Sequence, residues 1–366
     1  MSYHHQKRIR LLDIFRGIAI LGTLGGTNIW IFAYLGDISY IFTFDHYEWW
    51  SSIDHFIRIL SLSLVNGKLL GLLAIMFGIG LELKYQQSLR KGRPWPGVYL
   101  WTSLFLLIEG FLHFTFVMEY DILMAYAIAA IIVAFIVKAG MKYIKRSLIL
   151  IGVIHLLFIL LLFLAGLTQQ ISGNFLGGDM QETTYLYENK SWLDQIQYRL
   201  SNFLSLRGGE AIFTIPLNVF LFLTGGVLLM RKGAFANDAK GRYIRRKMLQ
   251  IGLCVGLPLN LLLFVPGGLF DFPVRYLFAP ILSIVYGSYR IYGRKKGIAT
   301  CMGNSRKGWK SFAKLLCNAE HSLFDYFLWM GGLRRSSFRR LIHNTTHFMP
   351  SECCSSIICY SLAQIL

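Results

Sequence analysis

The residues best suited to chemistry lie in the stretch EGFLHFTFVMEYDILMAY, which begins at Glu109. Glu109 and His113 are four residues apart, so a helix would place them on one face, and Glu119 and Asp121 follow in a short turn. A histidine beside carboxylates is suited to taking and releasing protons. We therefore predict that His113, Asp121, Glu119 and Glu109 form a catalytic group with His113 as general base. The alternative is a core histidine without a chemical role.

A second set of polar residues lies in the first apolar segment. Asp13 and Arg16 are three residues apart at its start, within LDIFRGIAILG, and Asn28 lies near its end. Placing such a charge in hydrocarbon costs about 2.5–3.5 kcal/mol, so charged side chains there usually pair or act on a substrate. We predict that Asp13, Arg16 and Asn28 bind substrate. The alternative is that they only pair helices or neutralise one another.

Lys68 is the third feature, within NGKLLGLLAIMFGIGLEL. Counting along the expected helices places both Lys68 and Glu109 about 13–16 Å deep, so the two side chains are predicted to meet. Their contact would be either a buried ion pair or part of a relay for protons or substrate. Lys68 is therefore added to the predicted substrate-binding residues.

Composition determines which elements position these residues. Hydrophobic residues make up 55% of the 366 residues and charged residues 15%, which is outside the range of ordinary soluble domains. Only helices or closed barrels cross a bilayer, and apolar runs of about 20 residues favour helices. We predict an all-α, polytopic transmembrane helical bundle of about eight spans: 11–33, 58–82, 97–117, 121–137, 147–168, 211–230, 248–268 and 274–292.

The formal charge of +18 is distributed over alternate connections between the predicted spans. This pattern follows the positive-inside rule and predicts a cytoplasmic N-terminus, with the loops 36–56 and 169–208 facing outward. The positive charge therefore reflects the topology of the spans more than a nucleic-acid partner. The alternative is that the basic residues bind an anionic lipid or a nucleotide. The expected partners are the lipid bilayer and a small-molecule substrate, with no nucleic acid. No complete zinc-binding pattern is found, so no metal site is predicted.

The last part of the chain departs from this pattern. Residues 1–296 form the predicted transmembrane domain, whereas residues 297–366 form a basic tail with five of the six cysteines and no full-length apolar span. This tail is interpreted either as a cytoplasmic regulatory segment or, preferentially, as the result of a slipped reading frame near Lys314. In the second case the tail is frame-shifted or disordered.

Residues 10–292 resemble the YeiB-like family of bacterial multi-pass membrane proteins, whose domain of unknown function is related to acyltransferase-like proteins. The resemblance rests on LDIFRGIAILG at 12–22, GKLLGLLAIMFGIGLEL at 67–83, FLHFTFVMEYDIL at 111–123 and LTGGVLLMRKGAF at 223–235. It implies a location in the bacterial plasma membrane. The residues that match the family pattern are Asp13, Arg16, Gly17, Asn28, Lys68, Gly78, His113 and Asp121. Two departures are an extra residue before Asn28 and the lack of the family's later spans after Lys314.

These observations lead to one leading functional hypothesis and two alternatives. In the first, the protein handles an acyl group or another small anionic substrate across the membrane. Arg16 would receive the anionic part of a donor such as acyl-CoA, Lys68 and Glu109 would line the path, and His113, adjusted by Glu119 or Asp121, would act as base. The second is a proton-coupled transporter that uses Lys68, Glu109, His113 and Asp121 as a relay. The third is a non-enzymatic structural membrane protein.

Overall fold

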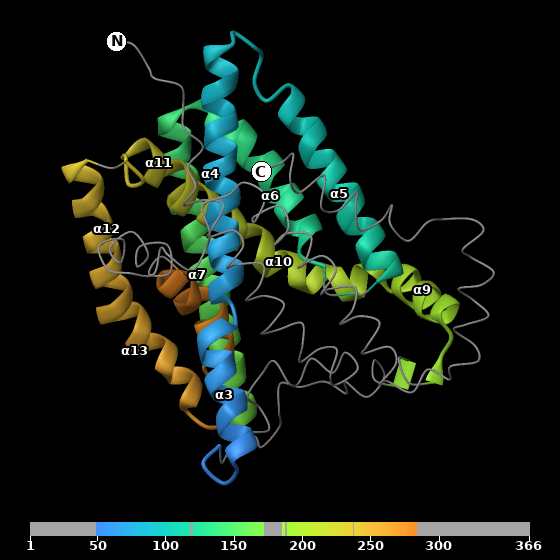
Figure 1. The fold of residues 1–366 in the computed structure, drawn as a ribbon. Coiled ribbons are helices and arrows are strands. Elements are labelled where there is room, and N and C mark those ends of the chain that lie inside the picture. Colours follow the sequence, from blue (N-terminus) through green and yellow to red (C-terminus); the bar gives the residue numbers. More distant parts are fainter. Residues whose placement is uncertain are drawn as a thin grey trace, which may run out of the picture.

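A computed structural model describes residues 49–283, except 118, 120, 172–184, 187–188 and 237. The described residues form helices joined by short connections, with no β-strand among them (Figure 1). The predicted all-α class is therefore confirmed for this part of the chain. The tail at 297–366 and the first predicted span lie outside the described residues.

Five helical segments are long and apolar enough to cross a membrane: Ile53–Arg90, Val98–Phe116, Met141–Thr168, Ala211–Arg231 and Ala239–Phe264. A sixth, Leu123–Ala139, is apolar but shorter. These six correspond in order to the predicted spans from the second to the seventh. The eighth predicted span, 274–292, is described only as far as residue 283.

The first of these segments consists of two helices. They are α3 (Ile53–Val65) and α4 (Lys68–Arg90), separated by Asn66 and Gly67. Gly67 has a φ of +74°, a left-handed conformation that favours glycine. At 1.5 Å per residue, the 38 residues of the segment extend over about 57 Å, well beyond a hydrocarbon core of about 30 Å.

The helices that follow are α5 (Val98–Phe116), α6 (Leu123–Ala139) and α7 (Met141–Ile171). The chain then continues through α9 (Trp192–Ser201) and α10 (Phe203–Leu221). The remaining elements of the described residues are the π-helix η3 (Phe222–Leu228), α11 (Leu229–Arg231), α12 (Ala239–Ile251), η4 (Gly252–Gly256), α13 (Leu257–Asn260), η5 (Leu261–Phe264), α14 (Asp271–Pro273) and η6 (Val274–Phe278).

In Figure 1, α4 stands upright between α5 on one side and α12 on the other. Its closest neighbour is η3, and the main apolar core lies where α4, α6 and η3 meet. Phe77 of α4 stacks on Phe222 of η3 with ring centroids 6.0 Å apart. The backbone of Gly78 touches that of Phe222 and of Gly226, so a side chain at Gly78 has no room. Small residues of this kind let membrane helices approach closely.

Polar contacts join the ends of several helices at one end of the bundle. Arg231 donates two hydrogen bonds to the buried carboxylate of Glu82, at 2.9 and 3.0 Å, and its guanidinium lies over the ring of Tyr85. Trp95 donates to the carbonyl oxygen of Ala134, near the end of α6. These contacts bring the basic stretches 84–93, 138–146 and 231–247 to the same end, as the alternating charge pattern predicts.

The contact between α4 and η3 yields a prediction with a matched control. Gly78→Val should lower the thermal stability of the detergent-solubilised protein, because overpacking a tight contact costs about 1–3 kcal/mol. Gly80→Val places the same side chain on the same helix, where a Cβ meets nothing within 4 Å among the described contacts. Thermal unfolding of both variants checks this. Equal losses of stability would show that valine in α4, and not the helix contact, is responsible.

Candidate functional site

The predicted catalytic residues gather at the end of α5 and in the turn that follows. Asp121 directs Oδ1 toward His113, with 3.4 Å to Nδ1, while its Oδ2 accepts a hydrogen bond from the backbone N–H of Met124 at 2.9 Å. Gly110 makes this approach possible, since a Cβ there would lie 2.7 Å from Oδ2 of Asp121. Asp121 therefore both caps the start of α6 and faces the imidazole. The ring itself stays within reach of a ligand, because 23% of the His113 side chain is exposed.

Glu109 lies one helical turn before His113 and is buried, with 8% of its surface exposed. Neither carboxyl oxygen has a hydrogen-bond partner among the described residues. His113 and Asp121 are the ionisable groups that act on it. A buried carboxyl group without a partner is costly, and a proton or a ligand would relieve that cost.

Two arginines that the sequence analysis did not select hold the turn between α5 and α6. Arg207 of α10 donates to the carbonyl oxygens of Glu119, at 2.9 Å, and of Asp121, and lies over the ring of Phe114. It therefore positions the backbone that carries Asp121.

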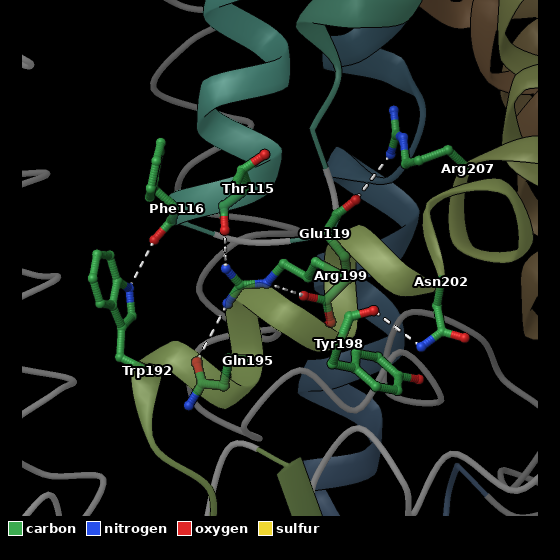
Figure 2. A network of polar contacts seen from close by, with 9 residues as sticks. All are labelled: Thr115, Phe116, Glu119, Trp192, Gln195, Tyr198, Arg199, Asn202 and Arg207. Atoms are coloured by element: carbon green, nitrogen blue, oxygen red, sulfur yellow. Dashed lines mark hydrogen bonds and ion pairs between the residues drawn. The ribbon is translucent and has the colours of Figure 1, made fainter.

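Arg199 of α9 is 1% exposed and ties the same turn to the end of α5 (Figure 2). It donates to the carbonyl oxygen of Thr115 at 2.7 Å and to Oε1 of Gln195 at 3.3 Å. Its Nε lies 3.6 Å from Oε2 of Glu119. The Glu119 carboxylate thus faces Arg199, so among the two carboxylates considered for His113 only Asp121 contacts it.

The segment that supplies these arginines corrects the predicted loop at 169–208. Residues 192–201 form α9, and α10 begins at Phe203, eight residues before the predicted sixth span. A capping box between Ser191 and Asp194 starts α9, and the hydrogen bonds from Ser191 hold the pKa of the Asp194 carboxyl below its usual range. Trp192 then donates to the carbonyl oxygen of Phe116 and stacks on that ring, which attaches α9 to the end of α5 (Figure 2).

Lys68 lies apart from this group. Its side chain is fully buried at the start of α4, where Nζ donates to the carbonyl oxygen of Leu62 at 3.5 Å. The neighbouring cation is Arg275, and no ion pair joins Lys68 to Glu109 in the described structure. The predicted contact between Lys68 and Glu109 is therefore wrong for the described residues. Equal depth in a bilayer does not fix which side of a helix a residue occupies.

The remaining predicted residues, Asp13, Arg16 and Asn28, lie outside the described residues. Within the described ranges, no group of three or more His, Cys, Asp or Glu residues has an arrangement that holds a metal ion. The structure therefore brings together three residues of the predicted site, Glu109, His113 and Asp121. The fourth, Glu119, faces Arg199 instead.

Comparisons with known proteins add little on function. No family model matches the chain, so the resemblance to the YeiB-like family stays a prediction. The chain is 24% identical over 307 residues to the uncharacterized protein YxaH of Bacillus subtilis (strain 168), an alignment that covers 78% of this chain and 73% of YxaH. No solved structure matches.

The pair of Arg199 and Glu119 allows a test of how the turn is held. Arg199→Met should destabilise the protein by about 3–5 kcal/mol, because it leaves a buried carboxylate without its cation. Adding Glu119→Gln should restore part of that stability. Arg93→Met, which removes an exposed arginine, is the control and should have little effect. Thermal unfolding of the wild type, the two single variants Arg199→Met and Glu119→Gln, and the double variant measures the coupling, and simple additivity of the two substitutions would contradict it.

Proposed function

We propose that this protein is a bacterial plasma-membrane protein that transfers or moves an acyl group or another small anionic substrate across the bilayer, with Glu109, His113 and Asp121 as its proton-handling group. The observation that carries the proposal is the approach of Asp121 to His113, 3.4 Å between Oδ1 and Nδ1, beside the buried Glu109. A base oriented by a carboxylate is the arrangement that activates a hydroxyl group for attack.

In an acyl transfer, Nδ1–H of His113 would face Asp121, which leaves Nε2 to accept a proton. Nε2 would take the proton of an acceptor hydroxyl as its oxygen attacks the acyl carbonyl carbon. The bond between that carbon and the leaving group then breaks, and the protonated His113 returns the proton to the leaving group. Asp121 orients the ring and stabilises its charged form, as a carboxylate does in other acid–base sites.

The acyl donor that we propose is acyl-CoA. Acyl-CoA would be a substrate, and Asp13 and Arg16, the residues expected to receive it, lie outside the described residues. We therefore base the proposal on the acid–base group alone. Membership in the YeiB-like family, which the sequence motifs suggest, is part of the same proposal.

Orientation in the membrane is proposed from the charge distribution. The basic stretches gather at one end of the bundle, whereas the group around His113 lies at the other end of α5. A cytoplasmic basic end, and with it a cytoplasmic N-terminus, would put His113 toward the outer side. The segment Met141–Thr168 supports contact with lipid as a partner, since only 11% of its most apolar stretch of 18 residues is buried within the bundle.

Replacement of His113 tests the enzyme hypothesis. His113→Ala should reduce the transfer of label from radiolabelled acetyl-CoA to acceptors in membrane vesicles by about 10²–10⁴-fold, because the general base is lost. Asp121→Asn should cause a smaller loss, and His55→Gln, on the exposed part of α3, should cause none. Membrane insertion of each variant is checked by its yield in the membrane fraction. Full activity of a well-inserted His113→Ala protein would refute the role of His113.

A proton-coupled transporter is the second candidate, and the two unpartnered oxygens of Glu109 favour it. A carboxyl group inside a membrane helix is the usual carrier of a proton in such proteins. Uptake of radiolabelled acetate into energised vesicles should then stop on addition of a protonophore. In Glu109→Gln the residual uptake should no longer respond to the protonophore, whereas Asp54→Asn, at the exposed start of α3, should behave as the wild type. Wild-type uptake that ignores the protonophore would exclude this candidate.

A further inference from the structure

The side chains of α9 are arranged in the reverse of the order found on the surface of a water-soluble protein. The polar Gln195 and Arg199 are buried, and Arg199 reaches the end of α5 (Figure 2). Large apolar side chains lie outside instead: Trp192, Leu193 and Leu200 are exposed, Leu193 to 68%. A surface of this kind is unfavourable in water and favourable in contact with lipid.

The exposed residues of α9 divide into two sides of the helix. Leu193 and Leu200 are seven residues apart and share one side, whereas Asp194, Gln197 and Ser201 are spaced three and four residues apart and share the next. A helix with one apolar and one polar side exposed lies in the plane of the membrane surface, with its apolar side toward the acyl chains. The place of α9 beside the end of α5, a segment long and apolar enough to cross a membrane, agrees with this position (Figure 1).

The apolar side of α9 continues onto the exposed side of α5. Only 33% of the most apolar stretch of 18 residues in Val98–Phe116 is buried, and its exposed side chains include Phe105, Leu112 and Phe116. The ring of Phe116 stacks on that of Trp192, which joins the two helices. The side of a membrane-crossing helix that is not packed against protein meets the acyl chains of lipids. One surface suited to a lipid therefore extends along α5 to α9.

The acid–base group lies at the edge of this surface. His113 directly follows Leu112 in α5 and precedes Phe116 by three residues, and 23% of its side chain is exposed. Glu109, one helical turn earlier, is buried, and both of its carboxyl oxygens are without a hydrogen-bond partner among the described residues. A hydroxyl group that reached this point would find a base in His113 and would supply the donor that Glu109 lacks.

We propose that the exposed sides of α5 and α9 hold a membrane lipid whose head group carries a hydroxyl and lies at His113. Resting on the acyl transfer proposed above, that hydroxyl is the acceptor. Its oxygen forms an ester bond with the acyl carbon of acyl-CoA, the bond between this carbon and the sulfur breaks, and the hydroxyl proton passes through His113 to the leaving thiolate. Both the acceptor and the acylated product then stay in the membrane.

The position of α9 is tested by site-specific photocrosslinking of the full chain in nanodiscs. The photoreactive residue p-benzoylphenylalanine replaces either Leu193, on the apolar side of α9, or Gln197, on its polar side. Mass spectrometry should detect lipid adducts at position 193 and few or none at position 197. Crosslinks from position 193 to a second copy of the chain, or to another segment of the same chain, would show that protein and not lipid covers this side and would overturn the proposal.

The head-group preference is tested in the same way at Leu112, beside His113, with Trp101 in the first turn of α5 as the exposed control position. The nanodiscs contain phosphatidylcholine with small, equal amounts of phosphatidylglycerol, which carries hydroxyl groups, and phosphatidylethanol, which has the same charge and none. Adducts at position 112 should contain phosphatidylglycerol about fivefold more often, the preference that one additional hydrogen bond gives. Adducts at position 101 should show no preference, and Glu109→Leu should abolish the preference at position 112.

Equal labelling of the two lipids at position 112, or a preference that Glu109→Leu leaves intact, would overturn the lipid site. This readout needs no turnover, so it separates the lipid site from the acyl transfer. Label from radiolabelled acetyl-CoA should appear on phosphatidylglycerol in the same nanodiscs. Transfer to a water-soluble acceptor without a lipid preference would refute the lipid site alone, whereas a lipid preference without any transfer would refute the acyl transfer alone.

Discussion

The turn between α5 and α6 depends on two arginines that satisfy buried carbonyl groups. A helix that ends inside an apolar bundle has backbone carbonyl oxygens to which water would normally donate hydrogen bonds. Leaving these oxygens without a hydrogen bond destabilises the fold. Arg199 and Arg207 donate to Thr115, Glu119 and Asp121 from two other helices. Because Asp121 is held through its own backbone, the distance between its carboxylate and His113 is set by α10 as much as by α5. The geometry of the acid–base group is therefore a property of the tertiary structure and not of the local sequence.

Buried charges in this bundle fall into two kinds. Glu82 with Arg231 and Glu119 with Arg199 have a partner of opposite charge, which is what stable packing requires. Glu109 and Lys68 do not have one among the described residues. The first kind joins helices to one another, whereas a carboxyl group without a partner, as at Glu109, leaves binding capacity for a proton. This difference is the physical basis for placing chemistry at Glu109.

The sequence was informative where hydrophobicity or proximity along the chain decides the structure. Six predicted spans correspond to described helices because lipid selects long apolar runs. Glu109 and His113 lie four residues apart in α5, as their spacing predicts, and the short turn after α5 is too short to carry Asp121 away from them. Contacts between distant helices were not predictable in the same way. Depth alone pairs Lys68 with Glu109, but the charged group that acts on Lys68 is Arg275, 207 residues further along the chain.

Arg199 and Arg207 show a different limit of sequence reasoning. They lie in a segment whose polar residues resemble a loop, and its helical start is marked only by the Ser191 and Asp194 pair. The detectable signal was two arginines, eight residues apart, on the predicted outer side of the membrane, where the charge pattern predicts few of them. An arginine that departs from the topology rule must have another reason to be there. In both cases that reason is a buried carbonyl group at the end of α5 or in the turn that follows it, which no composition or periodicity encodes.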